Sequence, residues 1–319
     1  MLTDGVSTLK TRSPQVVLEP NATHWNPHRR PEVRIVYDNA ISKEEALRSV
    51  ASGDGRVDVV MDLTVDEARA FDGGRHGKIQ TKAAKTVLVG LFNENKPNSP
   101  WRDRELRRAM NHALDRQMIL DKGAHGHGLI MPAFIQPGRY GADPAMKPYP
   151  HDAQGALGAI EGADIPGKEV VIFSRPAWSG VVAAIAECLE RAGLTVRPVA
   201  GDGDPPEGWD IQLVWHFDWS PQYPVGVVHR EFFGSNGALR ASPEDERFDA
   251  LYAKLLRTPH QPEQEEIVRE AERYVYDEAK ALFLFSPYTL SAVSNRVEFT
   301  PYDTCMSELA ETRIGTAEI

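Results

Sequence analysis

Short apolar, β-prone runs alternate with a helical segment in the middle of this chain, and this alternation constrains the fold more than any other feature. Lys168–Phe173 and Leu194–Val199 have the composition of buried strands, and the helical pattern of Trp178–Ala192 lies between them. Asp210–His216 supplies a further strand. Because parallel strands need a long crossover connection, which is usually a helix, this order predicts parallel strands in an open α/β sheet.

A similar group of elements comes earlier in the chain. Val33–Tyr37 is a β-prone run, and Ser42 followed by Glu45 predicts a capping box at the start of a helix that continues to about Val50. Val57–Met61 is predicted as the next strand. This part of the chain is therefore also expected to be α/β.

Two longer apolar runs, Thr86–Phe92 and Ala281–Phe285, predict strands that are buried on both faces. At 319 residues the chain exceeds what one hydrophobic core usually serves, so we expect two lobes. We assign residues 1–92 and 286–319 to the first lobe and residues 93–285 to the second. The two apolar runs are the candidate crossings between the lobes.

The remaining segments are mostly helical or ordered loop. Asp103–Lys122 carries apolar residues near helical spacing and is predicted to form one helix. Pro132–Pro150 is rich in Pro, Gly and Tyr, which predicts an ordered loop. A helical region that begins near Phe248 continues with interruptions to Ala279.

Composition excludes several classes of protein. The formal net charge of −10 argues against nucleic-acid binding, which needs clustered Lys and Arg. Two cysteines, Cys188 and Cys305, are too few for a disulfide scaffold or an all-cysteine zinc site. Met1–Lys10 has no basic region followed by a long apolar stretch, so no secretory signal is visible. Either the chain stays inside the cell or its start is missing.

Aromatic and charged residues follow two of the predicted strands. Ligands of open α/β sheets collect beyond the carboxyl ends of strands, so these residues are candidates for a binding site. The candidate ligand-binding residues are Arg175, Trp178, Trp215, His216, Phe217, Asp218, Trp219 and Tyr223. The alternative for Asp218 is an acid of a surface loop beside core aromatic residues. Arg175 could pair with a ligand carboxylate or with an acid on the surface.

Other polar residues favour structural interpretations. His125 and His127 lack a third ligand at a diagnostic spacing, so a flexible loop is favoured over a metal site. His112 is predicted to be packed or hydrogen-bonded, and Cys188 shares an apolar stripe that predicts a place in the core. Because no nucleophile and base pair or phosphate-binding loop is visible, we predict a binding protein with no catalytic residues, metal or cofactor.

Several motifs resemble those of one family. Arg107–Arg116 has the pattern Arg-x-Ala-x-x-x-Ala-x-Asp-Arg, and Tyr149–Asp152 places a Tyr and an Asp before a predicted helix. Both features are similar to those of the peptide/nickel (family 5) solute-binding proteins of ABC importers. Further similarities lie at Leu18–Asn21, His24–Pro27, Ala46–Leu47 and Gly55–Val59. The resemblance extends from about Val17 to Gly315.

The resemblance implies a two-lobed, periplasmic-binding-protein-like fold of type II, with the first lobe incomplete because family members are substantially longer. It implies a solute-binding component of an ABC importer, for peptides or similar small cationic solutes. In peptide-binding relatives, the acid of a Trp-x-x-Asp segment receives the amino terminus of the ligand, and Asp218 stands at that position after Trp215.

The resemblance also bears on partners and location. It implies an ABC permease as a partner, and possible completion by a missing N-terminal segment. It implies an extracytoplasmic location, whereas a complete chain without a signal would be cytoplasmic. The alternative function is an intracellular ligand-sensing or regulatory module derived from the same fold, which suits the absence of a visible signal.

Overall fold

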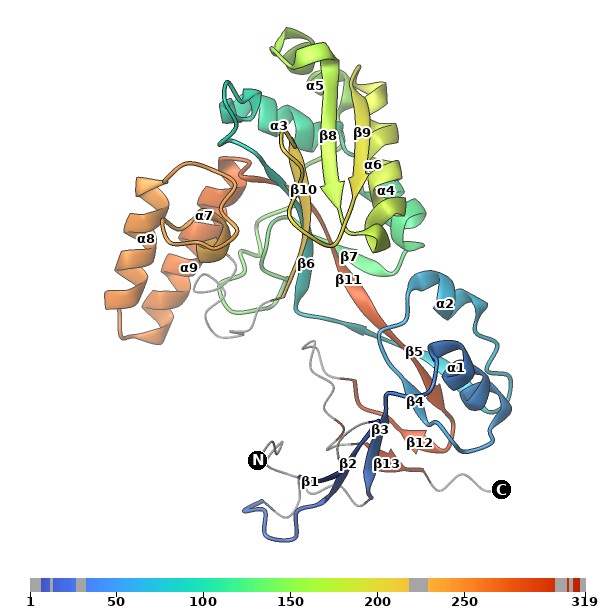
Figure 1. Ribbon diagram of the computed structural model, residues 1–319. Coiled ribbons are helices and arrows are strands. Elements are labelled where there is room, and N and C mark those ends of the chain that lie inside the picture. The colour runs from blue at the N-terminus through green and yellow to red at the C-terminus, as the bar shows by residue number, and fades with distance from the viewer. Residues whose placement is uncertain are drawn as a thin grey trace. The chain divides into compact units, whose positions relative to one another are not determined.

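The computed structural model describes residues 7–11, 14–26, 33–217, 229–301, 309 and 312–315. The chain divides into two compact units, unit 1 with Met1–Ala84 and Tyr288–Ile319, and unit 2 with Lys85–Pro287 (Figure 1). The first division lies before the apolar run Thr86–Phe92, whereas the predicted one followed it. That run belongs to unit 2 because its side chains are buried in the cores of that unit.

Unit 2 is built on a mixed sheet. Its strands are β6 (Thr86–Phe92), β7 (Gly128–Ile130), β8 (Glu169–Ser174), β9 (Thr195–Ala200), β10 (Ile211–Phe217) and the first half of β11 (Ala281–Ser294). β8 is parallel to both β9 and β10, as the alternation of strand and helix predicts. β6 is antiparallel to its neighbours β10 and β11. The order β11–β6–β10–β8–β9 therefore combines a parallel half with an antiparallel half.

Helices cover both faces of this sheet. They are α3 (Arg104–Ala113), α4 (Arg116–Ala124), α5 (Ala153–Gly162), α6 (Ser179–Arg191), α7 (Arg230–Phe233), α8 (Glu246–Arg257) and α9 (Gln261–Asp277). Within the described residues, no helix combines the length and the apolar composition that a membrane crossing requires.

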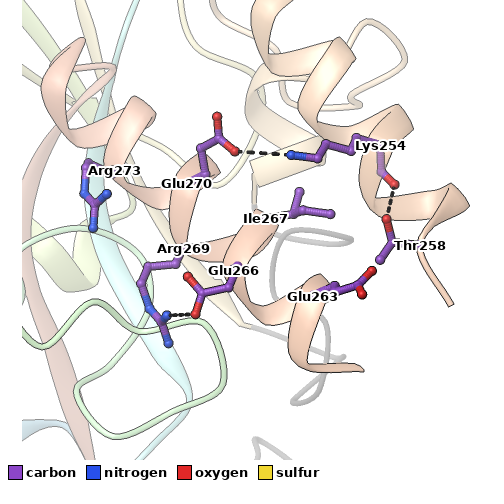
Figure 2. Close-up of a pocket in the computed structure, with 8 residues that line it drawn as sticks. All are labelled: Lys254, Thr258, Glu263, Glu266, Ile267, Arg269, Glu270 and Arg273. Carbon is purple, nitrogen blue, oxygen red and sulfur yellow. Dashed lines mark hydrogen bonds and ion pairs between the residues drawn. The ribbon is translucent and has the colours of Figure 1, made fainter. Parts of the chain in front are cut away.

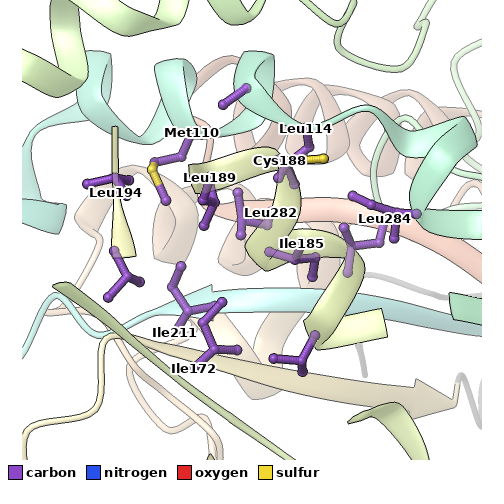
Figure 3. Packing of buried hydrophobic residues seen from close by; sticks show 14 of the residues in the cluster. Met110, Leu114, Ile172, Ile185, Cys188, Leu189, Leu194, Ile211, Leu282 and Leu284 are labelled. Atoms are coloured by element: carbon purple, nitrogen blue, oxygen red, sulfur yellow. The ribbon is translucent and has the colours of Figure 1, made fainter. Parts of the chain in front are cut away.

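Two hydrophobic cores lie on opposite faces of the unit 2 sheet. The first core includes Leu88, Met110, Ile172, Ile185 and Leu282, most of which are seen in Figure 3. The second core includes Val89, Phe134, Phe248, Val268 and Phe283. Because side chains alternate along a strand, Leu88 and Val89 of β6 enter different cores. This explains why the run Thr86–Phe92 is apolar throughout rather than at every second position.

The segment predicted as one helix, Asp103–Lys122, forms two helices, and the prediction was wrong at this point. Leu114 has an extended backbone (φ −86°, ψ 121°), which ends α3. Asp115 then begins α4, because its Oδ1 accepts a hydrogen bond from the Met118 N–H at 3.0 Å. Apolar spacing alone did not reveal the break, since both helices bury residues in the first core.

Polar residues of the Arg107–Arg116 motif attach these helices to β11. The Asn111 amide donates to the Ala281 carbonyl at 2.9 Å, and its oxygen accepts from the Phe283 N–H at 3.2 Å. Arg116 Nε donates to the Phe283 carbonyl at 2.7 Å, and its Nη2 donates to Asn111 Oδ1 at 2.8 Å. The motif with the most specific resemblance to the family therefore serves the fold.

Unit 1 contains a three-stranded sheet and a separate α/β group. Its elements are β1 (Ser7–Thr11), β2 (Gln15–Pro20), β3 (Ile35–Asp38), α1 (Lys43–Ser52), β4 (Val59–Val60), α2 (Val65–Ala70), β5 (Gly77–Ala83), the second half of β11, β12 (Val297–Glu298) and β13 (Arg313–Ile314). Ser42 caps α1 by accepting from the Glu45 N–H, but the Glu45 carboxylate pairs with Arg56 instead of completing the predicted capping box. The complete capping box lies at Thr64, at the start of α2.

Candidate functional site

The carboxyl ends of β8 and β10 lie at the same edge of the unit 2 sheet. The two strands are parallel, with Ile211 opposite Ile172 and Gln212 opposite Phe173. β8 ends at Ser174, whereas β10 continues beyond it along β6 as far as Phe217. Among the described strands, the last residues of β10 therefore have a neighbour, β6, on one side only.

Trp215 is the exposed aromatic residue at this end of the sheet. Ile211 and Leu213 belong to the first core, so the alternation along β10 places Trp215 on the same face. Trp215 lies opposite Leu88 of β6, which in turn lies opposite Phe285 of β11. Its side chain is 39% exposed, whereas Leu88 and Phe285 are buried.

Trp178 lies on this same face of the sheet. It ends the short 3-10 turn Pro176–Trp178, which links β8 to α6. Its ring is half-buried against the first core and meets the Phe285 ring edge-on, with 6.5 Å between the ring centroids. Trp215 and Phe285 lie on either side of Leu88 in the sheet, and Trp178 contacts Phe285, so both tryptophans lie on this face near the carboxyl ends of β8 and β10.

Arg175 begins the connection after β8 and is exposed. Its backbone carbonyl accepts a hydrogen bond from the Trp178 N–H at 3.0 Å, which fixes the turn. Its guanidinium makes no hydrogen bond or ion pair to any residue that the structure describes. Of the two alternatives for Arg175, the second would need a nearby surface acid. No acid in the described part of the chain pairs with it.

His216 points away from this group. It lies on the opposite face of β10, where its ring meets the Phe232 ring edge-on at 5.0 Å between centroids. Burial there lowers the pKa of His216 below its usual range, and nearby His229 adds to this effect although Glu231 opposes it. Trp178 and Trp215 therefore lie on one face, whereas His216 lies on the other and packs against Phe232 of the second core.

The side chains of four candidate residues lie outside the part of the chain that the structure describes. Asp218, Trp219 and Tyr223 lie outside the described residues, and only the backbone of Phe217 is described. Their assignment to a binding site stays a prediction.

Sequence reasoning missed a buried ionisable pair in the second core. His229 Nε2 donates to Glu272 Oε2, and both side chains are at most 2% exposed. Glu272 Oε1 also accepts the N–H groups of Phe134 and Ile135, each at 2.7 Å. A signal was present, because Glu272 follows buried Val268 by four residues and precedes buried Val275 by three, within the apolar stripe of α9.

His112 and Cys188 contribute to packing and hydrogen bonding. His112 Nδ1 lies 3.0 Å from the Pro150 carbonyl, and its ring contacts Tyr149, so the histidine is packed and hydrogen-bonded. Cys188 is buried in the first core, and burial raises the pKa of its thiol. In the described part of the chain, no group of three or more His, Cys, Asp or Glu side chains is arranged to hold a metal ion.

A pocket of about 600 Å³ lies along α8 and α9 (Figure 2). It is lined by Lys254, Thr258, Glu263, Glu266, Ile267, Arg269, Glu270 and Arg273. Four of its charged groups pair within the pocket: Lys254 meets Glu270 at 3.7 Å, and Arg269 meets Glu266 at 2.5 Å. None of the described candidates Arg175, Trp178, Trp215 and His216 lines it, so this pocket is separate from the two tryptophans.

Comparison with solved structures identifies the fold. The substrate-binding protein CtaP of Listeria monocytogenes superposes with a TM-score of 0.82 at 15% identity, over 97% of this chain and 65% of that one. NikA of Staphylococcus aureus, solved with Ni(L-His)2, gives a TM-score of 0.74 at 14% identity, over 97% and 68% of the two chains. The chain therefore has the mixed α/β, two-lobed fold of periplasmic binding proteins.

Sequence comparison identifies the family. The probable D,D-dipeptide-binding periplasmic protein DdpA of Escherichia coli (strain K12) is 25% identical over 302 residues. The match covers 89% of this chain but 56% of DdpA, so the chain spans little more than half the length of that relative. Residues 8–237 match the profile of the bacterial extracellular solute-binding proteins, family 5 Middle. Because that profile extends over most of the chain, the protein belongs to the family 5 bacterial extracellular solute-binding proteins.

Proposed function

We propose that this chain is the solute-binding component of an ABC importer and that it binds peptides or similar small cationic solutes outside the cytoplasm. Family membership supports the general role, and the relatives include a probable D,D-dipeptide-binding protein and an oligopeptide-binding protein solved with a nonapeptide. The observation that carries the proposal is the placement of Trp178, after the end of β8, and Trp215, near the end of β10, on one face of the sheet.

The chemistry of the strand-end group suits a short peptide. Indole rings offer apolar surface to a side chain of the solute and exclude water from polar contacts nearby. The exposed Arg175 guanidinium can form a bidentate pair with a carboxylate, such as the carboxyl terminus of a peptide. Asp218 is proposed, from the family resemblance, to receive the amino terminus.

Calorimetry and thermal shift against a defined panel test this function. The panel contains L-Ala-L-Ala, D-Ala-D-Ala, tetra-alanine, free alanine and the nickel–histidine complex. We expect at least one member to bind, and we expect Trp215→Ala to weaken that binding about tenfold, which corresponds to about 1.4 kcal/mol. Leu256→Ala on α8, which removes another exposed apolar side chain, should leave the affinity unchanged.

Two further variants separate the ends of the solute. If a peptide binds, Arg175→Gln should lower the affinity for the peptide with a free carboxyl terminus more than the affinity for the same peptide with an amidated one. Asp218→Asn should lower the affinity for the peptide with a free amino terminus more than the affinity for the peptide with an acetylated one. The proposed function would be refuted if no panel member raised the melting temperature and native mass spectrometry of the purified protein showed no bound solute.

A further inference from the structure

Two histidines of unit 2 pack into the same aromatic cluster of the second core. The His229 ring meets Phe134 edge-on at 5.2 Å and lies nearly parallel to Phe248 at 6.3 Å. The His216 ring meets Phe232 at 5.0 Å. Phe134 and Phe232 are themselves 5.6 Å apart, so one set of aromatic rings surrounds both imidazoles. These are distances between ring centroids.

Each imidazole carries a buried nitrogen without a hydrogen-bond partner among the described residues. His229 Nε2 must carry a hydrogen, because Glu272 Oε2 is its acceptor and Oε1 of the same carboxylate accepts two backbone N–H groups. The remaining nitrogen, His229 Nδ1, is unpartnered, and His216 Nε2 is unpartnered as well. A nitrogen lone pair without a hydrogen-bond partner at such a position costs less free energy than an N–H group would, because the N–H would be a buried donor without an acceptor.

We propose that His216 makes the packing of the end of β10 against α7 sensitive to pH. Protonation adds a positive charge to its ring and requires both ring nitrogens to carry hydrogens, although Nε2 has no acceptor among the described residues. The ring can then be satisfied only by water, which requires it to leave its aromatic neighbours. Because His216 is the residue next to Trp215, acid pH loosens the strand end that carries this tryptophan.

The charged groups near His216 offset this cost only in part. Glu231 of α7 favours the protonated ring, but its carboxylate already accepts from Arg230 at 3.1 Å and from the Ala238 N–H at 3.1 Å, and burial has the larger effect. Next to the cluster, α9 contributes Glu272, whose carboxylate is bonded to His229 Nε2. The contacts from α8 and from the loop at Phe134 are aromatic.

The sign of the effect follows from the direction of the pKa shift. Burial lowers the pKa of His216 in the folded protein, whereas the unfolded chain has the ordinary value of about 6.5. Between these two values the unfolded state binds more protons than the folded state. The contribution of neutral His216 is therefore complete above about pH 6.5 and is lost progressively as the pH falls below it.

Calorimetry of the ligand-free protein tests the proposal, so its outcome does not depend on the proposed function. The melting temperature is compared at pH 7.5 and pH 5.5 for the wild type and for the variant His216→Phe. Phe keeps an aromatic ring on Phe232. We expect the drop in melting temperature to be smaller in the variant by at least about 3 °C. His260→Gln, which removes a histidine whose side chain is 67% exposed, should keep the full drop.

A second measurement covers the case in which His216→Phe does not fold. In histidine-labelled wild-type protein, the ring signal of His216 should titrate below the ordinary histidine value of about 6.5. An equal loss of melting temperature in wild type and His216→Phe would overturn the proposal. So would titration of the His216 ring at or above the ordinary value in the folded protein.

Discussion

At the scale of single residues, the helix motif that most resembles the family contributes to packing rather than to chemistry. Arg116 is 5% exposed and has no carboxylate partner among the described residues; its guanidinium donates to the carbonyls of Phe283, Asn111 and Tyr149 at 2.7, 2.9 and 3.2 Å. Burial lowers the pKa of Arg116 to about 10, so it stays charged at neutral pH. Removing hydrogen bonds from a buried charge that is satisfied by carbonyl dipoles lowers stability, because each group left without a partner remains desolvated.

Asn111 offers the sharpest test of this packing role. Asn111→Leu keeps the volume of the side chain but leaves the Ala281 carbonyl, the Phe283 N–H and one Arg116 N–H without partners. We expect the free energy of unfolding to fall by about 3 kcal/mol, measured by urea denaturation. The control is Gln117→Leu, which changes an exposed amide of α4 and should alter stability by less than about 0.5 kcal/mol. Equal effects of the two substitutions would contradict the packing role of Asn111.

At the scale of elements, one residue decides that two short helices replace the single helix that the apolar spacing predicts. Asp115 Oδ1 accepts the Met118 N–H at 3.0 Å and thereby satisfies a donor that the first turn of α4 would otherwise leave bare. Asp115→Ala should therefore destabilise the protein by about 1 kcal/mol, whereas Asp115→Asn, which keeps an acceptor, should cost only a few tenths. Chemical denaturation of both variants, with Asp121→Ala on the exposed face of α4 as the control, checks this. A loss as large in Asp115→Asn as in Asp115→Ala would show that the cap is not the cause.

Some strand pairings could be predicted from the sequence, and others could not. The parallel pairing of β8 with β9 and β10 followed from the strand and helix alternation, because it depends on local composition and short connections. The antiparallel insertion of β6 between β10 and β11 did not, because it joins residues as far apart in sequence as Leu88 and Phe285. The same limit applies to the candidate site: strand ends can be located from local patterns, but the face on which His216 lies depends on the register of β10.

At the scale of the whole molecule, β6 decides where unit 2 begins. It lies between β10 and β11, and its side chains enter both cores of the unit. A fragment that begins at residue 93, as the predicted boundaries imply, would leave the backbone edges of both neighbouring strands unpaired. It would also remove Leu88 from one core and Val89 from the other.

We therefore expect a fragment of residues 85–287 to fold by itself and a fragment of residues 93–285 not to do so. The longer fragment holds the two cores of unit 2 and every element described for it, and both of its ends lie next to paired strands. It should show a single cooperative urea transition and a dispersed amide NMR spectrum, because a unit with complete cores unfolds as one. The shorter fragment should bind a hydrophobic dye and lose near-ultraviolet circular dichroism, since its cores stay open. Cooperative folding of residues 93–285 would mean that β6 is dispensable, and failure of residues 85–287 would mean that unit 2 depends on unit 1 for its stability.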